Sequence, residues 1–280
     1  MTHALEIDNL CYAYPDGTPA LHGISLRVKK EKKTALLGTN GSGKTTLLYH
    51  LNGTIPAQEG LVRVKECPVC KENLPRVRRM VGLLFDNPDN QLFSTTVYGD
   101  IAFGPRNMGL TDEEIAKRVD EAIRRVGIEE LAERPPYCLS LGQKKRAAIA
   151  GLLAMEPEIM VCDEPFSGLD PAVAGQFRAI LDHLKGQGKT LVYSTHDVDL
   201  AYGWADEVVV MKEGRILDSG PVDLLCDEDL MQEASLQLPM LAEMFKNSAF
   251  KPRTAKEASR ILSGFGLTAA KGRERAADGV

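Results

Sequence analysis

Long apolar runs are absent from this sequence. The longest, residues 147–155, has nine residues, whereas a membrane-spanning helix needs roughly 18. The first ten residues alternate between polar and apolar side chains and contain no apolar signal core. We therefore expect a chain with neither a membrane span nor a targeting signal, so that any work at a membrane would need other subunits.

An excess of positive charge is also missing. The 280 residues include 34 lysines and arginines against 39 aspartates and glutamates, a net charge of −5. This balance gives no global basic surface for nucleic acid. We interpret the densest basic cluster, residues 29–33, as a solvated turn. Hydrophobic residues make up 44% of the chain and charged residues 26%, which is ample for an ordinary globular core.

Cysteines are few and scattered, so a disulfide framework is not expected. Cys67 and Cys70 form a C-x-x-C pair, but no second Cys or His pair follows at ligand spacing. A structural zinc site normally needs four ligands. The sequence favours a surface hairpin with two incidental thiols, and a shared metal or redox site is the alternative.

The chain does contain the alternation of strands and helices that is typical of an α/β protein with a parallel sheet. Short apolar runs bounded by polar residues predict buried parallel strands at residues 34–37, 81–85, 159–162 and 190–194. Residues 5–28 instead alternate in polarity around the turn signal Pro15-Asp16-Gly17. They predict an N-terminal antiparallel β subdomain.

A helical pattern occupies residues from about 88 to 155 and predicts a subdomain inserted into the α/β core. Thr111 and Glu114 form a capping box, apolar residues follow at helical spacing, and Gly127 ends that helix.

The character of the chain changes near residue 226, where we place the end of a core domain, residues 1–226. Residues 227–267 predict a short helical extension, opened by Pro239 and by a second capping box at 254–257. Its two amphipathic helices are too small to form a core alone and must pack on the main domain or on a partner. Residues 268–280 are charged, small and non-aromatic, and predict a disordered tail.

A glycine-rich loop between an apolar strand and the helical pattern at 45–52 is the strongest chemical signal. Its sequence fits G-x4-G-K-[ST], in which glycines let several backbone N–H groups point at one phosphate and the helix adds its positive dipole end. Lys44 would reach the β- and γ-phosphates, and Thr45 would offer its hydroxyl to Mg²⁺. The expected nucleotide-binding residues are Gly38, Thr39, Asn40, Gly41, Ser42, Gly43, Lys44, Thr45 and Thr46.

An acidic pair follows the apolar run 159–162. Asp163, expected beside the phosphate loop, can hold Mg²⁺ directly or through water. Glu164 could polarise the attacking water as a general base. Taken alone, these residues could simply be a solvated acidic turn, but the phosphate loop upstream favours the catalytic interpretation.

A third motif, residues 139–143, reads Leu-Ser-Leu-Gly-Gln and precedes a basic triplet and an apolar helix. Ser140 and Gln143 also fit a capping box, although such a helix start is at the same time an anion site. With the two preceding motifs, this one resembles the signature of ABC ATPases, commonly L-S-G-G-Q. The resemblance covers roughly residues 4–226 and implies nucleotide contacts for Ser140, Gly142 and Gln143. Leu141 replaces the first signature glycine, and we expect it to be tolerated.

Further positions match the family in order. Residues 167–170 resemble the D-loop, which implies a nucleotide contact for Asp170. His196 resembles the H-loop histidine that contacts the γ-phosphate. Tyr14 lies where the family places the aromatic ring that stacks on adenine, with Tyr12 as the other candidate.

The main departure from the family is Asp86, which stands where the family usually has glutamine. That glutamine touches Mg²⁺ and the attacking water and relays contact with the membrane partner. Aspartate still supplies an oxygen ligand, but it is shorter and adds negative charge beside Asp163 and Glu164. We expect hydrolysis to survive with a slower rate or an altered metal dependence. Gln91 could substitute for the missing glutamine.

Residues 87–93, 144–155 and 236–239 look like the ATPase of energy-coupling-factor importers, particularly the cobalt and nickel branch; a vitamin importer of that type is the alternative. In that family two ATPase subunits pack head to tail, and each ATP lies between one phosphate loop and the other signature. The resemblance implies ATP and Mg²⁺ as cofactors, and a homodimer or a pair with a paralogue. It also implies a transmembrane coupling protein, a membrane substrate-binding protein and a peripheral place on the cytoplasmic face of the cell membrane. The extension would serve dimer contact or pack on its own domain.

A soluble ABC ATPase acting on nucleic acid or ribosomes is the alternative from a different class. Such proteins usually have two tandem ATPase domains or a long inserted coiled coil, whereas this chain has one motif set and no heptad run. The sequence therefore favours the ATPase subunit of a membrane importer, with no nucleic-acid partner.

Overall fold

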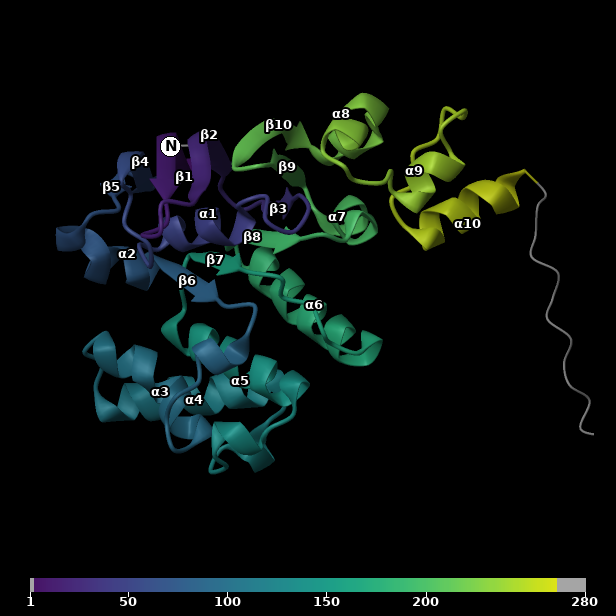
Figure 1. Ribbon diagram of the computed structural model, residues 1–280. Coiled ribbons are helices and arrows are strands. Elements are labelled where there is room, and N and C mark those ends of the chain that lie inside the picture. Colours follow the sequence, from purple (N-terminus) through teal and green to yellow (C-terminus); the bar gives the residue numbers. More distant parts are fainter. Residues whose placement is uncertain (1–2, 266–280) are drawn as a thin grey trace, which may run out of the picture.

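The computed structural model describes residues 3–265, which form two sheets with helices around them (Figure 1). One sheet is antiparallel and has the order β2-β1-β4-β5. Its strands are β1 (His3–Ala13), β2 (Pro19–Lys29), β4 (Glu59–Val64) and β5 (Cys67–Pro68). Residues 14–18 turn the chain from β1 into β2, as the turn signal Pro15-Asp16-Gly17 predicts.

The other sheet has six strands in the order β10-β9-β3-β8-β7-β6. They are β3 (Lys33–Leu37), β6 (Val81–Leu84), β7 (Ile159–Cys162), β8 (Thr190–Thr195), β9 (Glu207–Lys212) and β10 (Arg215–Pro221). All neighbours run parallel except β10, which pairs antiparallel with β9. The four predicted parallel strands are confirmed as β3, β6, β7 and β8. Because they run parallel, the loops after them open at one edge of the sheet.

The core lies on both faces of this sheet. Ala35 and Leu37 of β3 belong to the apolar cluster on the face that carries α5 and α6. Leu36, between them, belongs to a second cluster with α1 and the antiparallel sheet. This alternation is the strand period of two, so a run that is apolar throughout is buried on both faces. The helices packed around the core are α1 (Lys44–Leu51), η1 (Lys71–Asn73), α2 (Leu74–Met80), α6 (Pro171–Gly186) and α7 (Val198–Trp204).

A group of helices lies between β6 and β7 in the chain and forms one end of the molecule in Figure 1. It consists of η2 (Pro88–Asn90), α3 (Val97–Asn107), α4 (Asp112–Val126), η3 (Glu129–Leu131), η4 (Pro136–Cys138) and α5 (Leu141–Met155). Local signals set the ends of α4. Thr111 and Glu114 make a complete capping box, and Gly127 ends the helix with φ of 64°. We call this group the helical subdomain.

The short helix η5 (Val222–Cys226) lies at the end of the core domain, and the C-terminal extension comprises α8 (Glu228–Glu233), α9 (Met240–Met244) and α10 (Ala255–Gly264). The sequence did not predict α8. The second capping box is only half formed: Thr254 accepts from the Glu257 N–H, but the Glu257 carboxylate accepts from the Arg253 N–H instead of that of Thr254. The expected tail at residues 268–280 lies outside the described residues.

Two expected absences can be compared with the structure. Among residues 3–265, no helix combines the length and the apolar character that crossing a membrane requires. Cys67 is buried in β5 and Cys70 is half-buried. In that same part of the chain, no group of three or more His, Cys, Asp or Glu side chains is placed to hold a metal ion.

Candidate functional site

The phosphate loop curls between the end of β3 and the start of α1. Gly43 has φ of 97°, a left-handed conformation that suits glycine. A Cβ at Gly43 would lie 2.9 Å from the Ala20 carbonyl oxygen, and one at Gly38 would lie 2.4 Å from that of Met211. Gly43 caps α1 without any side-chain hydrogen bond. The first N–H groups of α1 are therefore left for a ligand.

Lys44 points back over this loop and is buried. Its Nζ donates to the carbonyl oxygens of Gly38, at 2.8 Å, and Thr39, at 3.0 Å. Burial lowers the pKa of the ammonium, and the carboxylates of Glu164 and Asp163 oppose this shift. Phosphate oxygens are anionic acceptors, so Lys44 can exchange these carbonyls for stronger, charge-assisted bonds.

Asp163 follows β7 and is almost completely buried. Its Oδ1 accepts a hydrogen bond of 2.6 Å from the Ser194 hydroxyl, whereas its Oδ2 is buried without a hydrogen-bond partner among the described residues. Burial raises the pKa of the carboxyl; the Ser194 bond and the neighbouring Thr45 hydroxyl oppose the shift. A buried carboxylate oxygen with no donor, close to a hydroxyl, fits the oxygen ligands that Mg²⁺ prefers.

Glu164 has a strained backbone, with φ of 41°. Its N–H donates to the Ser194 hydroxyl oxygen at 2.8 Å. Its Oε1 lies 3.1 Å from Nδ1 of His196, which follows β8 and has a side chain 63% exposed. Ser194 therefore holds both members of the acidic pair, and the predicted general base and H-loop histidine are in direct contact.

The structure separates Asp86 from Gln91. Asp86 lines the pocket over the phosphate loop and accepts from the Asn87 N–H at 2.6 Å. Gln91 is tied elsewhere: its amide accepts from the Phe85 N–H and donates to the Ala148 carbonyl oxygen. Gln91 thus links β6 to α5, while Asp86 is the side chain at the phosphate pocket.

That pocket has a volume of about 450 Å³. Tyr14 lines it and bonds through its hydroxyl to Thr46 at 2.7 Å. Tyr12 is not among the lining residues and packs its ring edge-on against His50. The lining residues are Tyr14, Thr18, Pro19, Ala20, Asn40, Gly41, Ser42, Gly43, Lys44, Thr45, Thr46, Asp86 and Glu164.

The signature residues do not line this pocket. Ser140 caps α5 in a full capping box, in which Gln143 Oε1 accepts from the Ser140 N–H at 2.9 Å and the Ser140 hydroxyl accepts from the Gln143 N–H at 3.4 Å. Asp170 is likewise engaged, as the cap of α6. A Cβ at Gly142 would lie 3.7 Å from Val173 Cγ1 and 4.0 Å from Leu169 Cδ2. Ser140, Gly142, Gln143 and Asp170 of the same chain therefore lie outside the lining of the pocket over the phosphate loop.

The sequence model of the ABC transporter family matches residues 21–167, from β2 through the phosphate loop and the signature to the acidic pair. The chain belongs to the ABC transporter family. It is 47% identical over 268 residues to the energy-coupling factor transporter ATP-binding protein EcfA of Carboxydothermus hydrogenoformans, covering 95% of this chain and 99% of that protein. EcfA of Methanocaldococcus jannaschii is also 47% identical, over 247 residues, with coverage of 87% and 88%. This ABC protein is therefore an ATP-binding subunit of the energy-coupling-factor type, and an ATPase.

Solved structures agree on the fold of this ABC subunit. It resembles cbiO1 from Clostridium perfringens, part of the ABC transporter complex cbiONQ, with a TM-score of 0.72, 40% identity and coverage of 88% of this chain and 100% of that one. It also resembles a dimeric ATP-binding cassette in a post-hydrolysis state with bound ADP and phosphate, with a TM-score of 0.72, 26% identity and coverage of 78% and 98%. The predicted α/β class with an ABC ATPase core is confirmed.

Two further residues of this ABC subunit belong to the site but were not predicted. Ser194 carries the hydrogen bonds to the acidic pair. Lys145, beyond the signature, donates to carbonyl oxygens of the turn that contains Glu164. Ser194 could have been found from the sequence, because it lies two residues before His196. The sequence contains no signal for the role of Lys145, because a lysine in a basic triplet is more often solvated.

Proposed function

We propose that two ATPase subunits pack head to tail, so that ATP bound at the phosphate loop of this chain meets the signature of the other subunit. The observation that carries this proposal is the separation within one chain. Tyr14, Lys44, Asp86 and Glu164 line one pocket, while Ser140 and its neighbours lie outside it. The partner is a second copy or a paralogue. The similar ATP-binding cassette with bound ADP and phosphate is dimeric, which supports a pair of subunits.

In this arrangement each predicted residue has a separate task. Lys44 and the N–H groups of the loop bind the phosphates, and Tyr14 offers its ring to adenine. Glu164 takes a proton from the attacking water, and His196, 3.1 Å from its carboxylate, orients it and reaches the γ-phosphate.

Mg²⁺, when bound, would neutralise charge on the phosphate oxygens, and Thr45, Asp163 and Asp86 are the side chains that would hold it. The unpartnered Oδ2 of Asp163 supports this assignment. Asp86 adds a third carboxylate beside Asp163 and Glu164, which favours binding of a cation.

The helical subdomain offers a docking place for a transmembrane coupling protein. Phe93 and Phe103 are 65% and 47% exposed, and their rings meet edge to face. Phe103 also lines a cavity of about 420 Å³ with Leu74, Met108 and Met155. An apolar groove of this kind fits the apolar face of a helix from a partner. We infer that the coupling protein binds here and holds the ATPase at the cytoplasmic face of the cell membrane.

We further propose uptake of cobalt or nickel through a membrane substrate-binding protein. The resemblance of residues 87–93, 144–155 and 236–239 to that importer branch supports this, as does the 40% identity to cbiO1 of the cbiONQ complex.

The test is a pull-down of the tagged full chain from detergent-solubilised native membranes, with mass spectrometry of the accompanying proteins. A polytopic coupling protein with a small membrane substrate binder is the expected result, and cobalt or nickel binding by that binder supports the metal assignment. A binder that takes a vitamin would overturn the metal assignment alone. Ribosomal proteins or nucleic acid without a membrane partner would overturn the importer.

A further inference from the structure

Lys145 lies in the second turn of α5 and points into the protein. It is 3% exposed. Its Nζ donates to the carbonyl oxygen of Ser167 at 2.6 Å and to that of Glu164 at 3.2 Å, with the Pro165 carbonyl at 3.5 Å. The neighbouring Lys144 turns outward to an exposed aspartate. A buried ammonium is costly unless hydrogen bonds compensate it, and here those bonds all come from one turn.

The turn that Lys145 holds contains the general base. Glu164 has φ of 41°, a conformation that non-glycine residues keep only where surrounding contacts impose it. Its N–H is fixed by the Ser194 hydroxyl. Its carbonyl oxygen accepts from Lys145 Nζ and from the Ser167 N–H at 3.1 Å. Ser194 fixes the Glu164 peptide from the sheet, and Lys145 fixes it from the signature helix.

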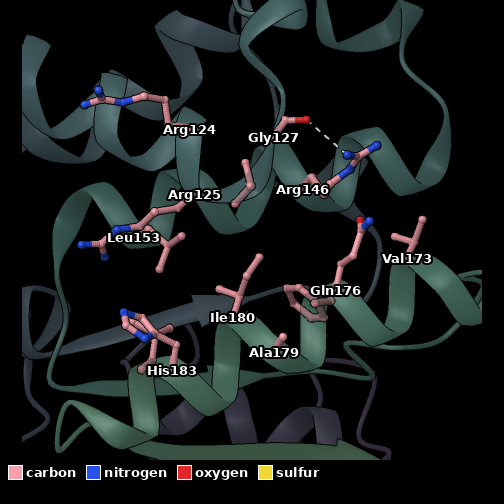
Figure 2. Close-up of a pocket in the computed structure, with 13 residues that line it drawn as sticks. Arg124, Arg125, Gly127, Arg146, Leu153, Val173, Gln176, Ala179, Ile180 and His183 are labelled. Carbon is pink, nitrogen blue, oxygen red and sulfur yellow. Dashed lines mark hydrogen bonds between the residues drawn. The ribbon is translucent and has the colours of Figure 1, made fainter.

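The boundary between the helical subdomain and α6 contains a cavity. Its volume is about 610 Å³, and its lining includes Leu153 on α5, Arg125 near the end of α4 and Ile180 on α6 (Figure 2). The start of α5, in contrast, contacts the turn that follows β7. A Cβ on Gly168 would lie 2.9 Å from Leu141 Cδ2, so the first residue of α5 packs on the D-loop. Lys145 and Leu141 therefore connect the signature helix to the turn of residues 164–168.

We propose that Lys145 is a positioning residue that transmits engagement of the signature at one ATP site to the general base at the other. This rests on the proposed head-to-tail dimer, in which Ser140 serves the partner's ATP while Glu164 serves the chain's own. When Ser140 closes on ATP, α5 moves with it. Lys145 then carries the Glu164 carbonyl and the D-loop along, and the carboxylate of Glu164 reaches its working position.

The test is a double-mutant cycle on the full-length dimer, with kcat and KM from steady-state ATP hydrolysis. Lys145→Met removes the donors and keeps the length of the side chain. Ser140→Asp keeps a good helix cap but repels phosphate, so it removes signature engagement without removing the cap. Lys189→Met is the matched control, because its Nζ also donates to a carbonyl oxygen, that of Glu156, at the surface.

We expect Lys145→Met to lower kcat by about 10- to 100-fold with KM changed by less than about threefold, and Lys145→Gln to restore most of the rate. In the Ser140→Asp background, Lys145→Met should cost less than about threefold, because no engagement remains to be transmitted.

The proposal would be overturned if the double variant lost kcat by the product of the two single-variant losses, which means no coupling. A Lys145→Met rate within about twofold of wild type would also overturn it. If Lys145→Met does not fold, Lys145→Leu, which also lacks a donor, takes its place in the same cycle. The wild type is also measured for ATP-dependent dimer formation. If it forms no dimer with ATP, the head-to-tail arrangement itself is wrong, which is a different outcome from an additive cycle.

Discussion

The phosphate loop and the signature both lie at the start of a helix, α1 and α5, yet the two starts differ. Gly43 leaves the first N–H groups of α1 without side-chain caps, whereas Ser140 and Gln143 satisfy those of α5 reciprocally. Lys44 is buried, while Leu141 is 45% exposed. The α1 start is ready for an anion. At the start of α5 the side chains of Ser140 and Gln143 already bond to the backbone N–H groups. They must give up these hydrogen bonds before they can bind phosphate.

The difference indicates an order of events. ATP binds first at α1, where free N–H groups already point at the phosphates. In the proposed head-to-tail dimer the signature engages second, because the partner's phosphate must compete with the Ser140–Gln143 hydrogen bonds.

Glu164→Gln has the largest expected effect, because it removes the proposed general base beside the phosphate loop and leaves the start of α5 unchanged. The amide keeps the size of the side chain but cannot take a proton, so kcat should fall on the order of 10³-fold while ATP affinity is retained. Size-exclusion chromatography with ATP and Mg²⁺ should show a stable dimer. Hydrolysis that continues at the wild-type rate would assign the general base to another residue.

Ser194→Ala is expected to affect only the phosphate-loop site, where Ser194 bonds to the acidic pair. It removes the bond to Asp163 and the acceptor of the Glu164 N–H, so we expect kcat to fall by about 10- to 100-fold and the Mg²⁺ requirement to rise. The readout is ATP hydrolysis over a Mg²⁺ titration. The control is Ser219→Ala at an exposed position of β10. Unchanged Mg²⁺ dependence would show that Ser194 does not act through the acidic pair.

Asp86→Gln removes a negative charge from the α1 pocket and restores the usual residue of the family. We expect a rise in kcat of about 3- to 10-fold with a changed Mg²⁺ optimum. Gln91→Ala is the control, because Gln91 bridges β6 and α5 outside the pocket lining. If Asp86→Gln leaves both rate and Mg²⁺ dependence unchanged, the added charge has no role.

Gln143→Ala has the smallest expected effect and tests the α5 side alone. It removes the acceptor of the Ser140 N–H, worth about 1 kcal/mol. Isothermal titration calorimetry should give an unchanged ATP affinity for the monomer. The ATP-dependent dimer should weaken by about fivefold, because losing the nucleotide contact predicted for Gln143 outweighs removing the competing bond. A weaker monomer affinity would contradict the separation of the two helix starts.

Local signals explain why much of this molecule could be predicted from its sequence. The caps at Thr111, Ser140 and Asp170 depend on residues within one turn of the chain, and all three form. The parallel strands were predictable because burial on both faces makes them apolar throughout. The phosphate loop was predictable because its glycines and lysine have a fixed spacing.

The remaining features depend on tertiary neighbours. Lys145 reads as a solvated lysine until the turn of residues 164–167 is placed beside α5. The tie from Gln91 to Ala148 spans 57 positions, which no local pattern encodes. The second capping box is only half formed, because the Glu257 carboxylate accepts from the Arg253 N–H instead of the Thr254 N–H.

The left-handed backbone of Glu164 also bears on how this protein can evolve. Glycine would adopt φ of 41° without steric cost, so Glu164→Gly relieves strain while it removes the general base. A library selected only for thermal stability will accumulate changes at this position, and its survivors will be firmly folded and inactive. Stability and turnover are opposed at a single residue here, and sequences under selection for transport alone keep the glutamate.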